Sequence, residues 1–454
     1  MREVLARLSL LIAILATTPL SAQGKVMRRQ DDRAPVNVQA AEKNGIRGYS
    51  SQRLLLYTDI EPERAREIVK LVDQVYATWE YQMGPLPEAR DQTEFQVTGY
   101  LMRDPQKFQK ANLLQARKLA NIIHGQNDGY TFWMHDQKRD YYREHLLLHE
   151  ATHCVTQCRE GEGDELRPLW FIEGMAEYFG THQPSAEGSP PESPLQFGII
   201  LTSAEASAGF GRIEMIRAEC EAGRALAAAD VLLLGAHEFS ESRTTPYAWS
   251  WALCTFLAKH PVTTEDYRHV CHQWETDEFL RAFQAFWMKH KTVITADWEL
   301  FRESLCYGFD LPRGATVRAE TTPLEPGATR EVQIRADRGW QSTGIGVLKD
   351  QSMQITATGR ITLAETTKPW LSEPQGISVR YSEGKPIGRL LGAIQRETPS
   401  EDGPVRCWEF FDIGPGSTIR APDAGTLFLR VNDRWSELSD NSGGYHATVT
   451  VPAS

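Results

Sequence analysis

The sequence predicts two folded regions in series, an α+β region over residues 49–314 and an all-β sandwich over residues 330–454. In the first region, apolar residues recur mostly at helical spacing, and a few short strand-like runs lie between the helices. Farther along, glycine and threonine become frequent and apolar residues alternate with polar ones, as in strands joined by turns. A chain of 454 residues is long enough for two or three domains. Residues 315–329 are expected to form the linker.

The first 24 residues are expected to be a secretory signal peptide, cleaved after Ala22 or Gly24. Arginines flank the start, Leu8–Leu15 is almost wholly apolar, and a proline and small residues follow. A membrane anchor is the alternative, but the apolar run is shorter than the roughly 20 residues that a spanning helix needs. We therefore expect an exported protein that is periplasmic, on the cell surface or secreted. Residues 25–48 are polar without periodicity and are expected to form a disordered arm.

Composition and cysteine use narrow the range of partners and environments. With 41% hydrophobic and 24% charged residues, the chain has the composition of an ordinary soluble protein. Its formal net charge of −11, without any basic cluster, argues against nucleic acid as a partner. Seven cysteines fit an oxidising compartment, and we expect them to form disulfides or buried thiols. Cys154 and Cys158, one helical turn apart, offer the alternative of a thiolate ligand for a metal.

The regular elements of the first region follow from apolar spacing and from residues that start and stop helices. Pro62, with an acidic residue on each side, is typical of a helix start, and the helical pattern continues to the stop at Gly84–Pro85. A stretch rich in proline and serine at 181–197 is expected to be a surface loop. We expect strands at 53–58, 94–102 and 128–135, and further helices at 105–114, 214–222, 246–260, 263–289 and 296–306.

The stretch HEATH, residues 149–153, carries the strongest chemical signal. It follows an apolar run in a helix that is expected to open near Tyr141. Because a helix turns about 100° per residue, His149 and His153 lie on one face, where both rings can bind one metal ion. Glu150 lies beside the first histidine, where a carboxylate can hold and deprotonate a water molecule. The alternative is a helix whose partly buried histidines hydrogen-bond within the protein and bind no metal.

Two histidines leave a zinc site short of a ligand, since catalytic sites use three protein ligands and keep the fourth position for water. The helix expected at WFIEGMAEYF, residues 170–179, offers Glu173 and Glu177, which are four apart and share a face. The chain between His153 and this helix is long enough to turn at Gly161–Gly163 and return. Spacing alone leaves both glutamates open as the third ligand.

HExxH followed by a Glu-Gly-x-Ala helix resembles the gluzincin metallopeptidases, the peptidase-MA-like group that includes thermolysin and the zinc aminopeptidases. The resemblance implies an α+β zinc-peptidase-like domain with an HExxH helix, a small mixed sheet and a helical subdomain. It implies that Glu173 is the third zinc ligand and that Glu177 orients a ligand histidine through its free ring N–H. It also implies that 128–135 is an antiparallel edge strand that binds substrate backbone by strand addition. The Gly-Ala-Met-Glu-Asn motif of the aminopeptidases is missing from this sequence, which puts aminopeptidase specificity in doubt.

Tyr247, in PYAWSWALCTFL, is a second candidate catalytic residue. Zinc aminopeptidases carry a tyrosine at the start of a comparable helix, downstream of the third ligand, and its hydroxyl stabilises the oxyanion. The similarity is short, so a second interpretation stays open in which Tyr247 only packs at the start of the helix.

The end of the chain resembles the closing segment of calcium-dependent bacterial galactophilic lectins, which are small β-sandwiches. The segment is LFLRVNDRWSELSDNSGGYHATVTV, and looser similarity covers most of 330–454. Asp433, Asp440 and Asn441 match the side chains that hold calcium in that family, with Asp440 replacing an asparagine, and such oxygen ligands suit calcium. The family's sugar-contacting His and Gln are not clearly present, so galactose specificity does not transfer. A purely structural sandwich is the alternative.

The sequence therefore predicts an exported metallopeptidase that hydrolyses peptide bonds with zinc at His149, His153 and Glu173 and with Glu150 as general base. Its partners would be a peptide or protein substrate and, through the lectin-like domain, a carbohydrate. Calcium would be a second bound metal. The alternative belongs to another class of protein, a non-catalytic carbohydrate-binding surface protein whose peptidase-like domain is a silent scaffold.

Overall fold

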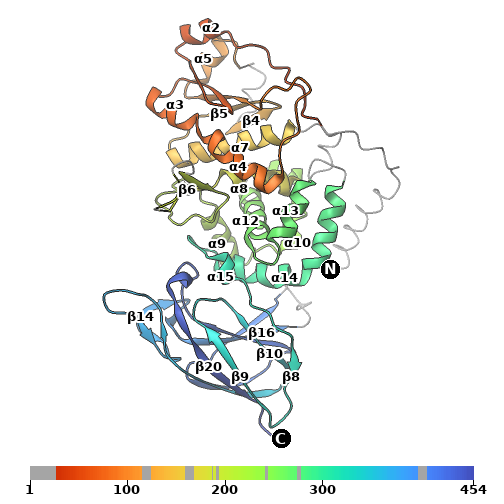
Figure 1. Ribbon diagram of the computed structural model, residues 1–454, viewed down its shortest axis with the longest axis vertical. Helices are drawn as coiled ribbons and strands as arrows, with labels where there is room; N and C mark the ends of the chain where they lie inside the picture. Colours follow the sequence, from red (N-terminus) through yellow and green to blue (C-terminus); the bar gives the residue numbers. More distant parts are fainter. Residues whose placement is uncertain are drawn as a thin grey trace.

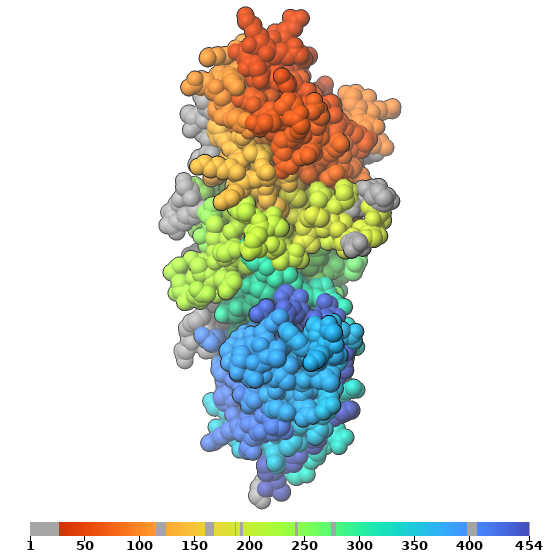
Figure 2. Space-filling view, turned by 90° about the vertical axis from the view of Figure 1, so that its left-hand side faces the viewer, coloured from red at the N-terminus to blue at the C-terminus, as the bar shows by residue number. Residues whose placement is uncertain are grey.

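The computed structural model describes residues 27–114, 124–158, 168–186, 188–190, 194–240, 244–273, 278–396 and 406–453. The expected signal peptide, residues 1–24, and the turn at Gly161–Gly163 lie outside the described residues. The chain forms a mixed α+β region followed by an all-β region, as the sequence predicts (Figure 1). These regions are stacked along the long axis, with the first sheet at one end and the sandwich at the other (Figure 2). Within the described ranges, none of the helices combines the length and apolar character needed to cross a bilayer.

A five-stranded mixed sheet in the order β1-β2-β3-β5-β4 forms the N-terminal end. Strands β2, β3 and β5 run parallel, and the outer strands β1 and β4 pair antiparallel to their neighbours. The expected edge strand at 128–135 is therefore wrong in position, because β5 lies inside the sheet and β4, just before it, forms the edge. A turn at Gly129, whose φ is 56°, joins these two strands. The strands are β1 (Arg47–Ser50), β2 (Leu54–Thr58), β3 (Val97–Met102), β4 (Gly125–Asp128) and β5 (Thr131–His135).

The arm at 25–48, which we expected to be disordered, is ordered throughout its described part. Helix α2 (Val38–Lys43) begins after Asn37, whose side-chain oxygen accepts a hydrogen bond from the N–H of Ala40 at 3.0 Å. Ala41 and Ile46 are buried in a small apolar cluster beside the sheet. Polar composition predicted disorder here, but the buried apolar residues and a hydrogen bond from Nη1 of Arg33 to Oγ1 of Thr98 on β3, at 2.7 Å, hold the segment against the sheet.

Three helices form the scaffold of the candidate site: α7 (Asp140–Gln157), α8 (Leu169–Gly180) and α12 (Thr245–Lys259). Helix α8 packs against both of the others. Gly174 makes the close contact with α12 possible, because a Cβ at this position would lie 2.6 Å from both the Ser250 carbonyl oxygen and Cys254 Sγ. The glycine of the EGMAEYF stretch thus has a packing role between two helices.

The boundaries of the helices differ from the expected ones in two parts of the chain. The helix from Pro62 is divided into α3 and α4, and the one expected at 263–289 is divided into α13 and α14. Helix α14 then continues through the break expected near 290, because Phe286, Ile294 and Trp298 recur at multiples of four and bury one face. The remaining helices are α3 (Pro62–Ile68), α4 (Leu71–Met83), α5 (Pro105–Lys110), α9 (Arg212–Glu221), α10 (Ala228–Val231), α11 (Ala236–Ser240), α13 (Thr264–His272), α14 (Phe279–Ser304) and α15 (Leu311–Gly314).

The C-terminal region is a sandwich of two sheets, in the orders β17-β16-β19-β10-β8 and β13-β12-β20-β11-β18, with β9 paired to β20. The predicted alternation is confirmed in β11, where Met353, Ile355 and Ala357 are buried and their neighbours are exposed. The strands are β8 (Thr322–Pro323), β9 (Thr329–Arg335), β10 (Gln341–Val347), β11 (Ser352–Thr358), β12 (Ile361–Thr362), β13 (Leu371–Ser372), β16 (Leu390–Arg396), β17 (Trp408–Asp412), β18 (Gly416–Arg420), β19 (Gly425–Val431) and β20 (Ser442–Thr450). Two short hairpins, β6 (His182–Pro184) with β7 (Leu195–Phe197) and β14 (Ile377–Ser382) with β15 (Lys385–Ile387), lie outside these sheets.

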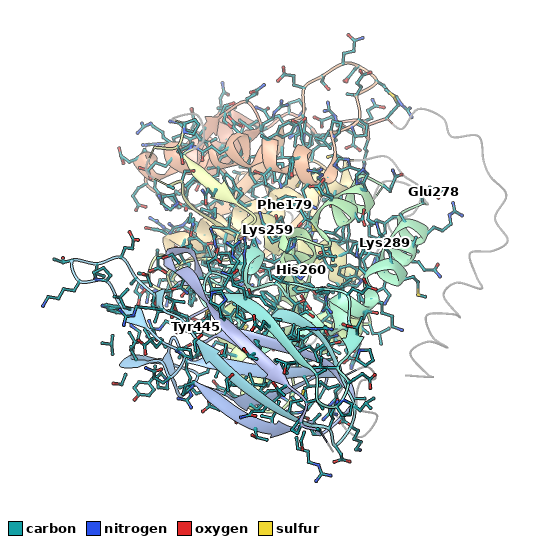
Figure 3. All side chains as sticks on the ribbon, turned by 60° about the horizontal axis from the view of Figure 1, so that its bottom comes forward. Phe179, Lys259, His260, Glu278, Lys289 and Tyr445 are labelled. Atoms are coloured by element: carbon teal, nitrogen blue, oxygen red, sulfur yellow. The ribbon has the colours of Figure 1, made fainter. Side chains whose placement is uncertain are left out.

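The sandwich shares part of its core with the helices. The indole N–H of Trp408 donates to the carbonyl of Ala296 on α14 at 2.9 Å. The rings of Phe309 and Trp435 stack with centroids 5.3 Å apart. His260 lies in the helical region and Tyr445 in the sandwich, which rests against the helices (Figure 3). Buried aromatic contacts of this kind hold the two regions together as one body.

The expected linker at 315–329 is largely built into this junction. The buried carboxylate of Asp297 accepts hydrogen bonds from the backbone N–H and the hydroxyl of Thr316. It also pairs with Arg318 at 2.7 Å and with Nε2 of His260 at 2.9 Å. Strand β8 then joins the sandwich beside β10. The connection is therefore tied at both ends to folded elements.

All seven cysteines lie among the described residues and are free thiols, five of them buried. Of the two expected states, disulfides or buried thiols, the structure contains the second. Burial raises the pKa of Cys154 well above its usual value and that of Cys158 to about 12. Among the described residues, neither thiol belongs to a group of side chains close enough to share a metal ion, so the thiolate alternative gains no support.

Candidate metal centre

Three potential ligand atoms converge between α7 and α8. The Nε2 atoms of His149 and His153 are 3.0 Å apart, and Oε2 of Glu173 lies 3.4 Å from the first and 3.3 Å from the second. In tetrahedral zinc sites with bonds of about 2.0–2.1 Å, neighbouring ligand atoms lie about 3.3–3.4 Å apart. The two rings and the carboxylate therefore have the chemistry and the spacing of a zinc ligand set.

The acidic side chains around His149 favour positive charge at the candidate site. Burial alone would lower the pKa of His149, but the hydrogen bonds and negative charge of Glu173 and Glu177 raise it well above its usual value. Burial alone would raise the pKa of Glu173, but the two histidines lower it to about 2. A divalent cation can supply the favoured charge while the imidazole nitrogens stay deprotonated and act as ligands.

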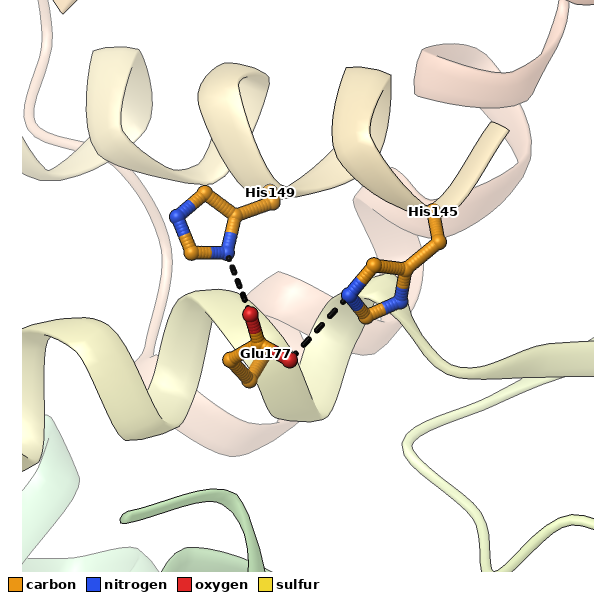
Figure 4. Close-up of side chains that lie close together, drawn as sticks. All are labelled: His145, His149 and Glu177. Carbon is orange, nitrogen blue, oxygen red and sulfur yellow. Dashed lines mark hydrogen bonds and ion pairs between the residues drawn. The ribbon is translucent and has the colours of Figure 1, made fainter. Parts of the chain in front are cut away.

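Glu177, one helical turn after Glu173, faces the other ring nitrogen of His149. Its Oε1 lies 3.4 Å from Nδ1 of His149, and its Oε2 lies 3.2 Å from Nε2 of His145 (Figure 4). The first distance is longer than a well-formed hydrogen bond and corresponds to a close charge contact. A carboxylate in this place orients the ligand ring and favours the tautomer whose Nε2 is free for a metal. The structure thus places Glu173 beside the Nε2 atoms of both histidines and Glu177 behind His149.

The guanidinium group of Arg212, on α9, forms hydrogen bonds with both carboxylate oxygens of Glu177. Its Nε donates to Oε2 and its Nη2 to Oε1, each at 2.9 Å, and both side chains are buried. Although burial acts in the opposite direction, the charges of Arg212 and His145 hold the pKa of Glu177 well below its usual value. Atoms of His145, His149 and Glu177 also lie close enough to form a second metal cluster. Arg212 already neutralises this carboxylate, so a second metal ion is not favoured there.

Glu150 faces the edge strand β4. Its Oε2 accepts a hydrogen bond from Nδ2 of Asn127 at 3.1 Å. Gly125, two residues earlier on the same strand, leaves the space that the carboxylate occupies. Glu150 is buried, with 5% of its surface exposed. The candidate general base therefore lies between helix α7 and the edge of the sheet.

Tyr247 lies in the first turn of α12, beside the candidate metal centre. Its ring centroid is 6.3 Å from that of His149, and Phe239 packs edge-on against it at 5.0 Å. Burial, and then the negative charges of Glu173 and Glu177, raise the pKa of its hydroxyl. The hydroxyl therefore stays protonated and can act as a hydrogen-bond donor. The structure brings this predicted residue to the site, although the packing role is also present.

The candidate calcium residues lie on one loop before β20 but differ in exposure. Asp433 and Asn441 are buried, whereas Asp440 is exposed at the end of a 3₁₀ turn, Leu438–Asp440. Burial raises the pKa of Asp433 to about 6, although Asn441 hydrogen-bonds its carboxyl. Oδ1 of Asn441 is buried and has no hydrogen-bond partner among the described residues. An acidic group and a free amide oxygen fit a hard cation such as calcium.

Sequence reasoning missed three residues that surround the candidate metal centre. His145 carried a usable signal, because it lies four residues before His149 and so on the same helical face. Arg212 is 35 residues from the glutamate that it binds, and Asn127 is 23 residues from its glutamate. Both come from other elements, so no local pattern links them to the HEATH stretch.

No protein-family model matches the chain, and no curated protein matches it. Among solved structures, the chain is similar to one described as "EclA N-terminal domain; PllA-like lectin", with 21% identity and a TM-score of 0.21. That similarity covers 27% of this chain and 95% of the other. A functionally unknown conserved protein from Bacillus anthracis str. Ames is similar at 14% identity and a TM-score of 0.16, over 28% of this chain and 22% of the other. At these TM-scores neither similarity determines the fold or the function of the chain.

Proposed function

We propose that the chain is an exported zinc-dependent metallopeptidase of the gluzincin type. The observation that carries the proposal is the convergence of His149, His153 and Glu173, with ligand-atom distances of 3.0, 3.3 and 3.4 Å, beside the buried carboxylate of Glu150. The order of these residues along the chain and their placement on two packed helices agree with the family pattern. Export is supported by the signal-peptide pattern of residues 1–24.

The chain's own residues divide the work of peptide hydrolysis. Zinc held by the two histidines and Glu173 would supply a Lewis acid that polarises the peptide carbonyl and acidifies water. Glu150 accepts a proton from the attacking water and passes it to the leaving amine. The hydroxyl of Tyr247 donates to the carbonyl oxygen as it becomes negative. Glu177 keeps the ring of His149 in place, and edge strand β4 aligns the substrate backbone by strand addition.

For the sandwich, we propose that Asp433, Asp440 and Asn441 bind calcium next to a carbohydrate, which would target the peptidase. The buried carboxyl of Asp433 supports this, as does the buried oxygen of Asn441, which has no partner in the described part of the chain. Calcium that binds only the folded protein stabilises it by mass action. The full chain should therefore melt at a higher temperature in millimolar calcium, and the Asp433→Ala variant should lose this shift. An unchanged melting temperature of the wild type in calcium would favour the alternative, a purely structural sandwich that binds no calcium.

Metal analysis and a peptide-library digest together test the peptidase proposal. Wild-type protein should contain one zinc per chain and cleave peptides. Glu150→Gln should keep zinc and lose cleavage by several orders of magnitude, because only the proton acceptor is removed. His149→Ala should lose stoichiometric zinc. Zinc binding without any cleavage by the wild type would favour the silent scaffold, and zinc retained in His149→Ala would refute the ligand assignment.

A further inference from the structure

We infer that Asn127 and Gln157 form a hydrogen-bond relay that positions the carboxylate of Glu150, which makes Asn127 a positioning residue for the general base. The catalytic consequence rests on the proposed peptidase function, whereas the relay itself rests on contacts among described residues. The relay begins at the turn between β4 and β5 and ends at the metal-binding helix, so it joins two elements that meet at the candidate site.

Three consecutive hydrogen bonds make up the relay. The backbone N–H of Gly129, in the turn after β4, donates to Oε1 of Gln157 at 2.7 Å. Nε2 of Gln157 donates to Oδ1 of Asn127 at 2.5 Å. Nδ2 of Asn127 then donates to Oε2 of Glu150 at 3.1 Å. Each amide side chain accepts one bond and donates one, and the carboxylate is the last acceptor.

The chemistry at the two ends decides the orientation of both amides. Gly129 offers a backbone N–H, which can only donate, so the Gln157 oxygen must face it. The Glu150 carboxylate can only accept, so the Asn127 amino group must face it. The remaining amide nitrogen and amide oxygen then meet with the correct polarity between Gln157 and Asn127. Reversing either amide would place two donors or two acceptors against each other, so the relay has one self-consistent arrangement.

The geometry of both elements explains why these residues meet. Gln157 lies seven residues after Glu150, two turns along α7, and therefore on the same face of that helix. Side chains alternate along a strand, so Gly125 and Asn127 point to one side of β4 and Gln126 to the other. Gly125 leaves room for the carboxylate and Asn127 supplies its donor. A larger residue at the first position or a residue without an amide at the second would disturb the same carboxylate.

This relay makes the position of the base depend on the turn of the β4–β5 hairpin. Strand β4 is the edge of the described sheet, where a substrate backbone would add in the proposed function. A hydrogen bond to the charged base also restrains its rotation, and restraint of a reacting group lowers the cost of reaching the productive geometry. Asn127 would therefore act on the turnover of bound substrate more than on substrate affinity.

The test is the isosteric Asn127→Asp variant of the full zinc-loaded chain. An aspartate can still accept from Gln157, but at neutral pH it cannot donate to Glu150 and it repels that carboxylate. We expect kcat to fall about 10–100-fold, as for other residues that orient catalytic groups, with KM and zinc content nearly unchanged. Gln157→Leu alone should lower kcat by less than Asn127→Asp does. The double variant Asn127→Leu/Gln157→Leu should have a kcat within about twofold of that of Asn127→Leu, because Asn127→Leu already breaks the relay. Gln354→Glu makes the same amide-to-carboxylate change at an exposed position of β11 in the sandwich and should leave kcat unchanged.

Crystal structures of the wild type and of Asn127→Asp provide a measurement that needs no substrate. In the variant, the Glu150 carboxylate should turn away from residue 127, while the ligand residues stay in place. An unmoved carboxylate, or kcat equal to that of the wild type, would overturn the inference. If the wild type cleaves no peptide but the carboxylate moves as expected, the proposed function fails and the positioning relay stands.

Discussion

Gly125 and Glu150 are in such close contact that a side chain at one excludes the carboxylate of the other. A Cβ built on Gly125 would lie 2.2 Å from Oε1 of Glu150 and 2.6 Å from its Cδ. The backbone of Gly125 has no positive φ, so the glycine is needed for space and not for an unusual conformation. The edge of the sheet thus approaches the candidate base more closely than any other residue type would allow.

Gly125→Ala should therefore reduce activity more than stability. The new methyl group meets the end of a side chain, which can rotate away, so the free energy of unfolding should change by less than about 1.5 kcal/mol. The displaced carboxylate loses its position for proton transfer, and we expect kcat to fall at least about tenfold. Thermal melting and steady-state kinetics measure the two effects. Gly48→Ala, on the opposite edge strand β1, is the matched control and should leave kcat unchanged.

The two glutamates of α8 should differ in their effect on metal affinity. Glu173→Ala removes the proposed third ligand atom and should abolish stoichiometric zinc. Glu177→Ala removes only the group behind His149, so we expect zinc affinity to fall about 10–100-fold. A competition titration with a chelator measures both values. The reverse order of effects would assign the ligand role to Glu177, whose contact with Arg212 would then have to break.

Tyr247→Phe separates catalysis from packing. The variant keeps the ring that contacts Phe239 and deletes the hydroxyl donor. If the hydroxyl stabilises the oxyanion, kcat should fall on the order of 10²–10³-fold with KM nearly unchanged. Zinc content and melting temperature should stay the same. A kcat within about threefold of the wild type would leave Tyr247 with only its packing role.

Asp297→Asn should destabilise the junction between the helices and the sandwich in a pH-dependent manner. Although burial acts in the opposite direction, the hydrogen bond with His260 and the charge of Arg318 lower the pKa of Asp297. A carboxyl group with a lowered pKa stabilises the folded state above its unfolded pKa of about 3.9. This contribution is lost as the pH falls through the folded pKa. The unfolding free energy of the variant should thus be roughly 2–3 kcal/mol lower than that of the wild type at pH 7, because the buried donors around Asp297 lose a charged acceptor.

Denaturant unfolding at several pH values measures the difference in unfolding free energy between the wild type and Asp297→Asn. This difference should become smaller only below about pH 4. Asp337→Asn is the control, because Asp337 pairs with the largely exposed Arg335 at the surface and should contribute at most about 1 kcal/mol. Equal losses from both variants, or a loss at Asp297 that is independent of pH, would contradict the buried-charge account of the junction.

Local periodicity was sufficient to predict the residues that share one face of an element. His149 and His153 converge because four residues complete about one helical turn, and Glu173 and Glu177 follow the same rule on α8. The same local geometry predicted the buried residues of β11, because side chains alternate across a strand. Choosing between the two glutamates required the family resemblance, and the structure places Glu173 with the two histidines.

The sequence by itself therefore determined the order of the two regions and the candidate ligand residues, since these depend on periods of a few residues. Only the tertiary structure decided which strand forms the edge of the sheet and which basic residue pairs with Glu177, namely Arg212. It also decided that Asn127 reaches Glu150. These contacts join positions far apart in the chain, and they depend on how helices and strands pack around a common core. Local periodicity in the sequence does not indicate such long-range contacts, so only the packing of the elements brings these groups together.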